Sequence, residues 1–328
     1  MRRIDEAEDP VRAVLEAHER GRPVALLTSG TSGAPRAVVR TTASWVGSFP
    51  YVAELTGLDR DSRVWLPGPR VTTMNLFAAV HAAWAGARVV EEPATATHVH
   101  LTPARLAEAL DDGTDLSGRH LVVAGDRLGS HLAERAASAG ARVSHYYGAA
   151  ELSFVAWGGH EHDLRPFPGV EVDLRDGEIW ARSPYLCDGY DGPAGPLRRD
   201  GDGFATVGDH GRLEAGVLHV LGRGEQAVTV GGATVHVTDV EAALQPHLSG
   251  EVAVLGVPHG RLGQVLAAVL TDDRERESAR RAAADLLAGA GRPRVWFHLP
   301  RLPVTHGGKL DRSTLAALVT GGDARRLG

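Results

Sequence analysis

Six consecutive small residues follow a short apolar run near the start of the chain. They are Thr28, Ser29, Gly30, Thr31, Ser32 and Gly33, and the cation Arg36 comes shortly after them. Backbone N–H groups made accessible by glycine, together with small hydroxyl groups, form a cradle for phosphate oxygens. The spacing matches neither a Walker A loop nor a G-x-S-x-G nucleophile elbow. This segment therefore leaves two alternatives open, a phosphate loop or a polar turn between strands.

Five more segments place glycines, carboxylates and cations in a fixed order along the chain. They are "HYYGAAE", "DGEIWARSPYLCDGY", "VGDHGRLEAGVLHVLGR", "EQAVTVGGATVHVTDVE" and "LPVTHGGKLDR". With the opening loop, these segments resemble the adenylate-forming superfamily, which includes acyl-CoA synthetases, luciferases and peptide-synthetase adenylation domains. The resemblance runs from about Val24 to the last helix, and the chain resembles short, N-terminally truncated ligases of the o-succinylbenzoate–CoA type or the acyl-CoA ligase type.

The resemblance implies a ligase that uses ATP and Mg²⁺ to join a carboxylic acid to AMP. The acyl group then passes to a thiol, for which CoA is the expected acceptor. In that reaction Lys309 neutralises the attacking carboxylate and the α-phosphate, and Glu151 holds Mg²⁺. The other site residues implied are the phosphate loop 28–33 with Arg36, the adenine-side residues Tyr147, Gly148 and Ala149, the ribose-binding Asp209 and Arg223, and Gly231 and Gly232 beside the pantetheine tunnel.

The chain departs from the family pattern at several of these positions. Arg36 replaces a lysine, which keeps the charge but changes the shape of the cation. Ala150 removes a hydroxyl that would donate to the α-phosphate, and Val207 replaces a threonine. Gln226 stands at the expected hinge between the domains. Arg70 stands where an aromatic residue or histidine closes the acyl pocket, and it either binds a second carboxylate of the substrate or lies exposed.

The elements that position these residues alternate between strand and helix in the first part of the chain. Short apolar runs such as "HVHLTP" and "RHLVVAGD" predict buried strands, and residues 74–86 and 103–110 predict helices between them. This alternation predicts an α/β domain with a mostly parallel sheet. From about Val170 the pattern becomes hairpin-rich, with a turn predicted at Asp176-Gly177. We expect a large domain at 1–225, with a β-rich subdomain, and a small mobile α+β domain at 226–328 that carries the lysine.

The first subdomain of the large domain is expected to be mostly missing. Only 27 residues precede Thr28, whereas members of the family have a much longer segment there. A truncation of this kind exposes one face of a sheet. We therefore expect a homodimer, or a partner protein, to cover that face.

Composition excludes several other classes of function. The chain has 328 residues and a net charge of −6 without a long run of one sign, which argues against nucleic acid or an anionic membrane as the main partner. No apolar run approaches the length of a membrane span, and the charged N-terminus does not resemble a secretion signal. With Cys187 as its single cysteine, the protein is expected in the cytoplasm, with that residue buried.

Three weaker patterns favour ordinary structural roles. The segment "GRGEQA" fits a dinucleotide-binding spacing, but the β-rich "VTVGG" follows it in place of a helix. His98 and His100, and likewise His160 and His162, are spaced to share one face of a strand. Neither pair has an evident third ligand, so a metal site is not expected there.

Two alternatives to a CoA ligase remain open. The acceptor thiol could be the phosphopantetheine arm of a carrier protein, because both thiols use the same tunnel. The chain could also be a catalytically silent nucleotide- or acyl-binding partner, which Arg36, Ala150 and the truncation favour. The joint presence of Glu151 and Lys309 with the ribose-binding pair argues against that second alternative.

Overall fold

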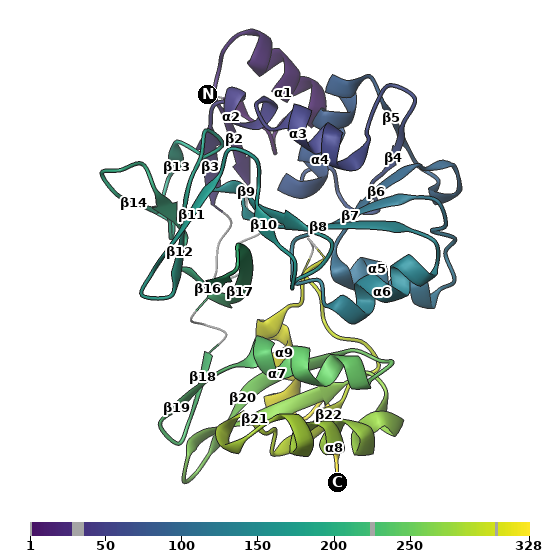
Figure 1. The fold of residues 1–328 in the computed structure, drawn as a ribbon, viewed down its shortest axis with the longest axis vertical. Helices are drawn as coiled ribbons and strands as arrows, with labels where there is room; N and C mark the ends of the chain where they lie inside the picture. Colours follow the sequence, from purple (N-terminus) through teal and green to yellow (C-terminus); the bar gives the residue numbers. More distant parts are fainter. Residues whose placement is uncertain (1, 28–35, 224–226, 306–307) are drawn as a thin grey trace. The chain divides into compact units, whose positions relative to one another are not determined.

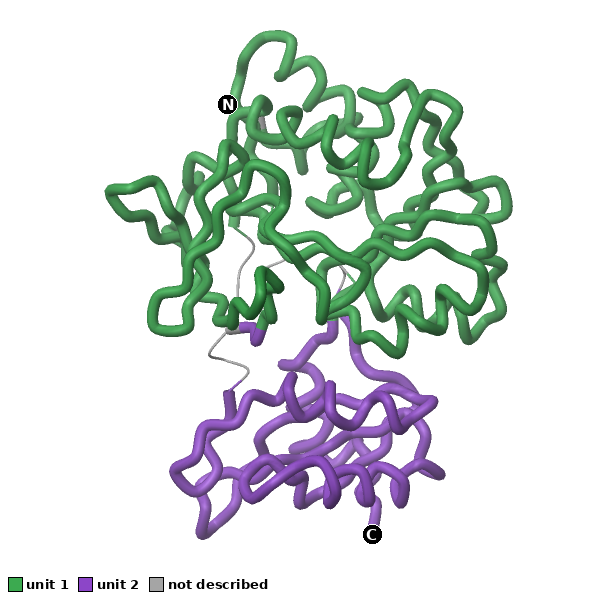
Figure 2. The backbone as a smooth tube through the Cα atoms, viewed as in Figure 1, with its two compact units in different colours: residues 1–220, 306–309 green, residues 221–305, 310–328 purple. Residues whose placement is uncertain are grey.

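The structure is a computed structural model that describes residues 2–27, 36–223, 227–305 and 308–328. Contacts between Cα atoms divide the chain into two compact units, which Figure 2 colours separately. The first unit contains residues 1–220 and 306–309, and the second contains residues 221–305 and 310–328. The mobility expected for the C-terminal domain stays a prediction, and the expected hinge residue Gln226 lies outside the described residues.

The largest sheet of the first unit has seven strands in the order β10-β9-β8-β7-β6-β4-β5. Neighbouring strands from β8 to β5 run parallel, whereas β9 and β10 are antiparallel. Apolar runs such as Leu121 to Val123 are fully buried, as expected for strands covered on both faces. The strands are β4 (Arg63–Trp65), β5 (Arg88–Val90), β6 (His98–Leu101), β7 (His120–Val123), β8 (Arg142–Ala149), β9 (Ser153–Gly158) and β10 (Arg165–Pro166).

Helices α5 (Pro103–Asp111) and α6 (Ser130–Ser138) cover one face of this sheet, as Figure 1 shows. On that face Val99 and Leu121 pack in one buried cluster with Leu106 of α5. Burial of such side chains contributes roughly 1.5–3 kcal/mol each.

Helices α3 (Phe49–Thr56) and α4 (Thr73–Ala85) lie on the opposite face of the sheet. His98 of β6 donates a hydrogen bond from Nε2 to the carbonyl oxygen of Thr56, at 3.1 Å. Helix α4 is apolar on nearly all sides and is largely buried, and it ends where Gly86 adopts φ 74°. It also packs against α1 (Pro10–Glu19), and the short helix α2 (Ala43–Val46) precedes α3.

Two further sheets complete the first unit. One has the order β1-β2-β3-β13, and the other has the order β14-β15-β12-β16-β17 with β11 paired to β12. The predicted hairpin turn is confirmed at Asp176 (φ 51°) and Gly177 (φ 81°), because a two-residue turn of this kind needs positive φ at both positions. The strands are β1 (Arg2–Arg3), β2 (Val24–Leu27), β3 (Ala37–Arg40), β11 (Glu171–Arg175), β12 (Glu178–Arg182), β13 (Gly189–Asp191), β14 (Arg198–Arg199), β15 (Ala205–Thr206), β16 (Asp209–Glu214) and β17 (Val217–Arg223).

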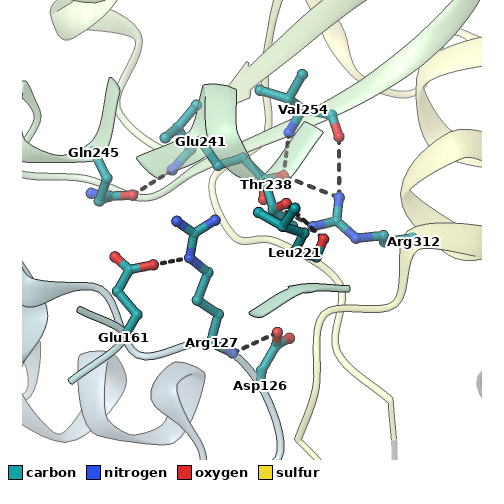
Figure 3. A network of polar contacts seen from close by, with 10 residues as sticks. Asp126, Arg127, Glu161, Leu221, Thr238, Glu241, Gln245, Val254 and Arg312 are labelled. Atoms are coloured by element: carbon teal, nitrogen blue, oxygen red, sulfur yellow. Dashed lines mark hydrogen bonds and ion pairs between the residues drawn. The ribbon is translucent and has the colours of Figure 1, made fainter. Parts of the chain in front are cut away.

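The second unit is an α+β domain. Its sheet has the order β19-β18-β21-β22-β23, with β20 paired to β21. Its elements are β18 (Ala227–Val230), β19 (Ala233–His236), α7 (Val237–Leu244), β20 (Val252–His259), β21 (Gly263–Leu270), α8 (Arg276–Leu286), β22 (Val295–His298), α9 (Arg312–Gly321) and β23 (Arg325–Leu327). Arg312 donates to both carboxylate oxygens of Glu241 on α7, at 3.0 and 2.9 Å, and to the carbonyl oxygen of Val254 at 3.1 Å (Figure 3). These bonds fix the start of α9, three residues after Lys309.

These elements confirm the predicted fold class, a mostly parallel α/β sheet with a β-rich part followed by a small α+β domain. Among the described residues, no helix combines the length and the apolar character needed to cross a membrane.

Candidate active site

The parallel strands of the seven-stranded sheet end along one of its edges. Thr102 directly follows β6, and Gly125 lies in the loop after β7. Val123 pairs with His145, so Tyr147 extends β8 beyond the end of β7. Open α/β sheets bind ligands outside the carboxyl ends of their strands. This edge is therefore where a ligand site is expected.

Lys309 lies at this edge. A Cβ atom added to Gly125 would lie 3.4 Å from Cε of Lys309 and 3.4 Å from Cγ2 of Thr102. A Cβ atom on Gly308 would lie only 2.9 Å from Oγ1 of Thr102. Gly125 and Gly308 both have positive φ, at 92° and 75°. The backbone beside the lysine thus requires glycine for its conformation and for its close approach to neighbouring residues.

Lys309 is also the only lysine among the 35 Lys and Arg residues of the chain. Every other strongly basic position is arginine, whose guanidinium is planar and bulky, whereas the ammonium of lysine is a compact charge on a flexible stem. This contrast gives a chemical reason to single out Lys309 that the motifs themselves do not contain.

The loop after β7 is held by an ion pair. The guanidinium of Arg127 pairs with Glu161, and the backbone N–H of Arg127 donates to the carboxylate of Asp126 at 2.8 Å (Figure 3). The side chain of Glu161 is only 9% exposed, so this pair is partly shielded from water. The contact stabilises the loop that places Gly125 beside Lys309.

Tyr147 and Asp209, which the motifs place in the nucleotide site, contact each other directly. The hydroxyl of Tyr147 donates a hydrogen bond to Oδ2 of Asp209 at 2.8 Å, which joins β8 to the first residue of β16. Gly148 follows at a shift in the register between β8 and β9, where a Cβ atom would lie 2.1 Å from the carbonyl oxygen of Ser153. Only glycine fits there, and Ala149 then pairs with Ser153.

Glu151 is buried, with 7% of its surface exposed. Its Oε1 accepts a hydrogen bond from the hydroxyl of Tyr190 at 2.8 Å, and its carbonyl oxygen accepts one from the N–H of Cys187 at 2.8 Å. Burial and the neighbouring carboxylate raise the pKa of Tyr190, so the phenol stays protonated and donates. Cys187 is buried, as predicted, and burial raises the pKa of its thiol.

Arg40 is a buried cation near Glu151 that the motifs did not identify. Its side chain is fully buried, and Nη2 donates to the carbonyl oxygen of Tyr185 at 2.8 Å. Burial lowers its pKa to about 10, and the nearby carboxylates of Asp188 and Glu151 partly offset that effect. The pattern of β3 gave no signal for it, because an arginine at the end of a strand is ordinarily solvated.

The structure describes the predicted residues Arg36 and Arg70, but not the phosphate loop. The phosphate loop Thr28–Gly33 and the side chain of Arg223 are not among the described parts of the chain. Arg36 is half-buried directly before β3. Arg70 is exposed and forms an ion pair with Glu91, which is the second of the two alternatives that the sequence left open.

Gly231 and Gly232 form the two-residue turn between β18 and β19, with φ 56° and 90°. This hairpin geometry requires glycine-like residues by itself. The turn therefore explains both glycines without a ligand, and their place beside a pantetheine tunnel stays a prediction.

Buried histidines line the sheet face beneath α3 and α4. His98 and His100 share a strand, and His98 stacks on His120 with ring centroids 5.8 Å apart. Burial lowers the pKa of His100 to about 3 and that of His120 to about 4, so both rings are neutral at pH 7. Within the described ranges, no group of three or more His, Cys, Asp or Glu residues could hold a metal ion.

Comparison with known proteins places the chain in a family. Residues 12–191 match the family described as AMP-binding enzyme. The chain is 27% identical over 323 residues to the uncharacterized acyl–CoA ligase YhfT of Bacillus subtilis, covering 87% of this chain and 66% of that protein. It is 30% identical over 327 residues to a probable 2-succinylbenzoate–CoA ligase of Mycobacterium tuberculosis, covering 90% of this chain and 84% of that protein.

A solved structure agrees with these relatives. An Escherichia coli MenE variant with bound OSB-AMS superposes with a TM-score of 0.79 at 26% identity, covering 91% of this chain and 69% of that one. The family match confirms the resemblance that the motifs predicted. The chain belongs to the AMP-binding enzyme family.

Proposed function

We propose that the protein is an AMP-forming acid–thiol ligase. It joins a carboxylic acid to the AMP moiety of ATP with release of pyrophosphate, and passes the acyl group from the acyl-adenylate to a thiol with release of AMP. The observation that supports this most strongly is the position of Lys309, which lies against Gly125 at the carboxyl ends of β6 and β7. A cation there meets a ligand bound at the sheet edge.

The first half-reaction brings two anions together. The carboxylate oxygen attacks the α-phosphorus, a bond forms between them, and the bond to the pyrophosphate oxygen breaks. Repulsion between carboxylate and phosphate is a large part of the barrier in a site of low dielectric. The ammonium of Lys309 offsets this repulsion, while the loop at 28–33 with Arg36 holds the leaving phosphates.

The nucleoside is positioned by residues from β8, β16 and β17. The ring of Tyr147 stacks on adenine, and its bond to Asp209 holds that ring in place. Asp209 and Arg223 bind the ribose hydroxyls. This arrangement supplies orientation, which lowers the entropic cost of reaching the transition state.

Glu151 fits the role of a magnesium ligand. Mg²⁺ in nucleotide sites is usually bound through one or two carboxylates together with phosphate and water oxygens. One carboxylate, held through Oε1 by Tyr190, meets that need without a larger cluster of acidic side chains. When bound, the ion neutralises charge that develops on the phosphates.

CoA is the proposed acceptor. The Bacillus and Mycobacterium relatives are both named as CoA ligases. In the second half-reaction the thiolate attacks the acyl carbonyl and AMP leaves, so the cation between carboxylate and phosphate is no longer needed. A carrier-protein phosphopantetheine arm is the alternative acceptor, and the experiment below separates the two.

The test is acid-dependent exchange of labelled pyrophosphate into ATP across a panel of carboxylic acids. The proposal expects exchange with at least one acid in the absence of any thiol, and net thioester formation when CoA is added. Exchange without thioester formation from CoA would indicate that the acyl group is transferred to another acceptor. No exchange with any acid, from a protein that binds ATP and is folded, would support the silent nucleotide-binding alternative.

A further inference from the structure

A small pocket opens beside the lysine segment at the carboxyl ends of β4 and β6. Its walls come from Pro67 and Pro69 after β4, from Asn75 on α4, from His100 and Thr102 at the end of β6, and from Gly308. Gly308 directly precedes Lys309. On the proposed function, this pocket lies where the organic part of the acid would extend from the activated carboxylate.

Asn75 brings an unsatisfied acceptor to this pocket. The residue is 3% exposed, and its Nδ2 donates to the carbonyl oxygen of Pro69 at 3.1 Å. This bond fixes which end of the amide is nitrogen. Among the described residues, Oδ1 has no hydrogen-bond partner. A buried acceptor left without a donor is destabilising, so a ligand that donates a hydrogen is favoured here.

His100 brings a second polar group to the same walls. It is 4% exposed, and burial together with His81, His98 and His120 lowers its pKa to about 3. A neutral imidazole carries one N–H donor and one acceptor nitrogen. Unlike the ring of His98, which bonds to Thr56, the ring of His100 makes no hydrogen bond within the described part of the chain.

The charges at the rim disfavour a second carboxylate in the pocket. Arg105 lines it, but its guanidinium is paired with Glu108 at 2.8 Å. Arg70, next to Pro69, is paired with Glu91. A carboxylate would meet the lone pairs of the Asn75 carbonyl oxygen, and the neutral ring of His100 would offer its charge a single N–H donor and no cation. A neutral group that both donates and accepts suits these walls better.

We propose that this pocket recognises a hydroxyl group on the carboxylic acid substrate, which donates its hydrogen to Oδ1 of Asn75 and accepts a hydrogen from the ring of His100. The substrate class is therefore a hydroxy acid, aliphatic or phenolic, and the two residues determine specificity. The inference rests on the proposed function for the position of the carboxylate, and it adds the identity of the distal group.

The test uses matched acids that differ in one group. The probes are 4-hydroxybenzoate, benzoate and terephthalate, with 3-hydroxybutyrate, butyrate and succinate as the aliphatic set. Binding to the wild-type protein is measured by calorimetry, and activation is measured by pyrophosphate exchange. We expect the hydroxy acid of at least one set to bind about tenfold more tightly than the other two members. Equal or tighter binding of the unsubstituted acid or the dicarboxylate in both sets overturns the inference.

Three variants assign the preference to the pocket. His100→Leu and Asn75→Leu should each reduce the preference for the hydroxy acid while binding of the unsubstituted acid is kept. His98→Gln is the matched control, because that buried histidine is on the same strand but bonds to Thr56 outside the pocket, and its preference should equal that of the wild type. If both leucine variants keep the full preference, the inference is wrong. If the protein prefers the hydroxy acid in binding but catalyses no pyrophosphate exchange, the proposed function is wrong and the assignment of the pocket still holds.

Discussion

The hydroxyl of Tyr147 donates a hydrogen bond to Oδ2 of Asp209 across 2.8 Å, and this bond joins two residues from motifs 62 positions apart in the chain. If the ring stacks on adenine and the carboxylate binds ribose, the bond couples the two halves of the nucleoside site. A hydrogen bond to a charged group contributes about 1.5–3 kcal/mol.

Tyr147→Phe keeps the ring and removes this bond. We expect the KM for ATP to rise about tenfold, with a smaller change in kcat, because the loss falls on nucleotide binding. The measurement is pyrophosphate exchange at varied ATP concentration. Tyr190→Phe is the comparison, since its hydroxyl bonds to Glu151 and not to Asp209. An unchanged KM in Tyr147→Phe would place adenine elsewhere.

Glu151→Gln should reduce acyl-adenylate formation by about two orders of magnitude or more, since it removes a charged ligand from the proposed metal site. Glu151 is buried, so the effect of this change on the fold has to be considered as well. The fold should still survive, because the amide oxygen of glutamine can accept the hydrogen bond from Tyr190. Wild-type activity with unchanged dependence on Mg²⁺ would refute the assignment.

Gly125→Ala should impair adenylation more than its effect on stability explains. The new Cβ atom would lie 3.4 Å from Cε of Lys309, and φ of 92° is strained for alanine. We expect about 1–2 kcal/mol of destabilisation from the backbone, in addition to the displacement of the lysine. Gly113→Ala is the matched control, because its φ is 70° but no atom lies within 4 Å of the added Cβ.

Both glycine variants should be less stable than the wild type, but only Gly125→Ala should also lose activity. Stability is measured by urea unfolding and activity by pyrophosphate exchange. A Gly125→Ala protein as active as Gly113→Ala would show that the lysine does not work from this position.

Stability should fall as the pH falls from about 6.5 toward 4. Burial lowers the pKa of His81, His120 and His145 to about 4, whereas an unfolded histidine titrates near 6.5. Below pH 6.5 the unfolded chain binds protons that the folded chain does not. Each such histidine therefore reduces the free energy of unfolding by up to about 1.4 kcal/mol per pH unit across that window. Above about pH 6.5, where histidines of the unfolded chain are also neutral, this loss of stability is absent.

The measurement is urea unfolding at pH 7.5, 6.5 and 5.5. His145→Gln should reduce the pH slope, because it removes one of these buried imidazoles. A flat profile between pH 6.5 and 5.5 would contradict the assignment of neutral, buried histidines.

The sequence was sufficient to predict those features of the fold that depend on local chemistry. Asp176-Gly177 predicts its turn because few other residue pairs adopt positive φ twice in succession. The apolar runs of β6 and β7 predict a buried parallel sheet because such strands need covering on both faces. The ordered motifs then place Tyr147 and Asp209 in one site.

The rest depends on contacts between distant segments, which no local pattern specifies. The close approach at Gly125 involves the side chain of Lys309, which lies far along the chain. Arg70 pairs with Glu91, 21 residues later, so its exposure could not be decided from the motif. Arg40 is buried because Tyr185 supplies an acceptor 145 residues away.

The most direct test of the central claim measures both half-reactions in Lys309→Ala, with Lys309→Arg as the variant that keeps the charge. We expect Lys309→Ala to lose nearly all pyrophosphate exchange with an acid that the wild type activates. The same protein, given preformed acyl-adenylate and CoA, should form thioester at close to the wild-type rate, because no second anion has to be neutralised in that step. Lys309→Arg should recover part of the exchange. Equal loss of both half-reactions in Lys309→Ala, or loss of neither, would show that Lys309 is not the adenylating lysine.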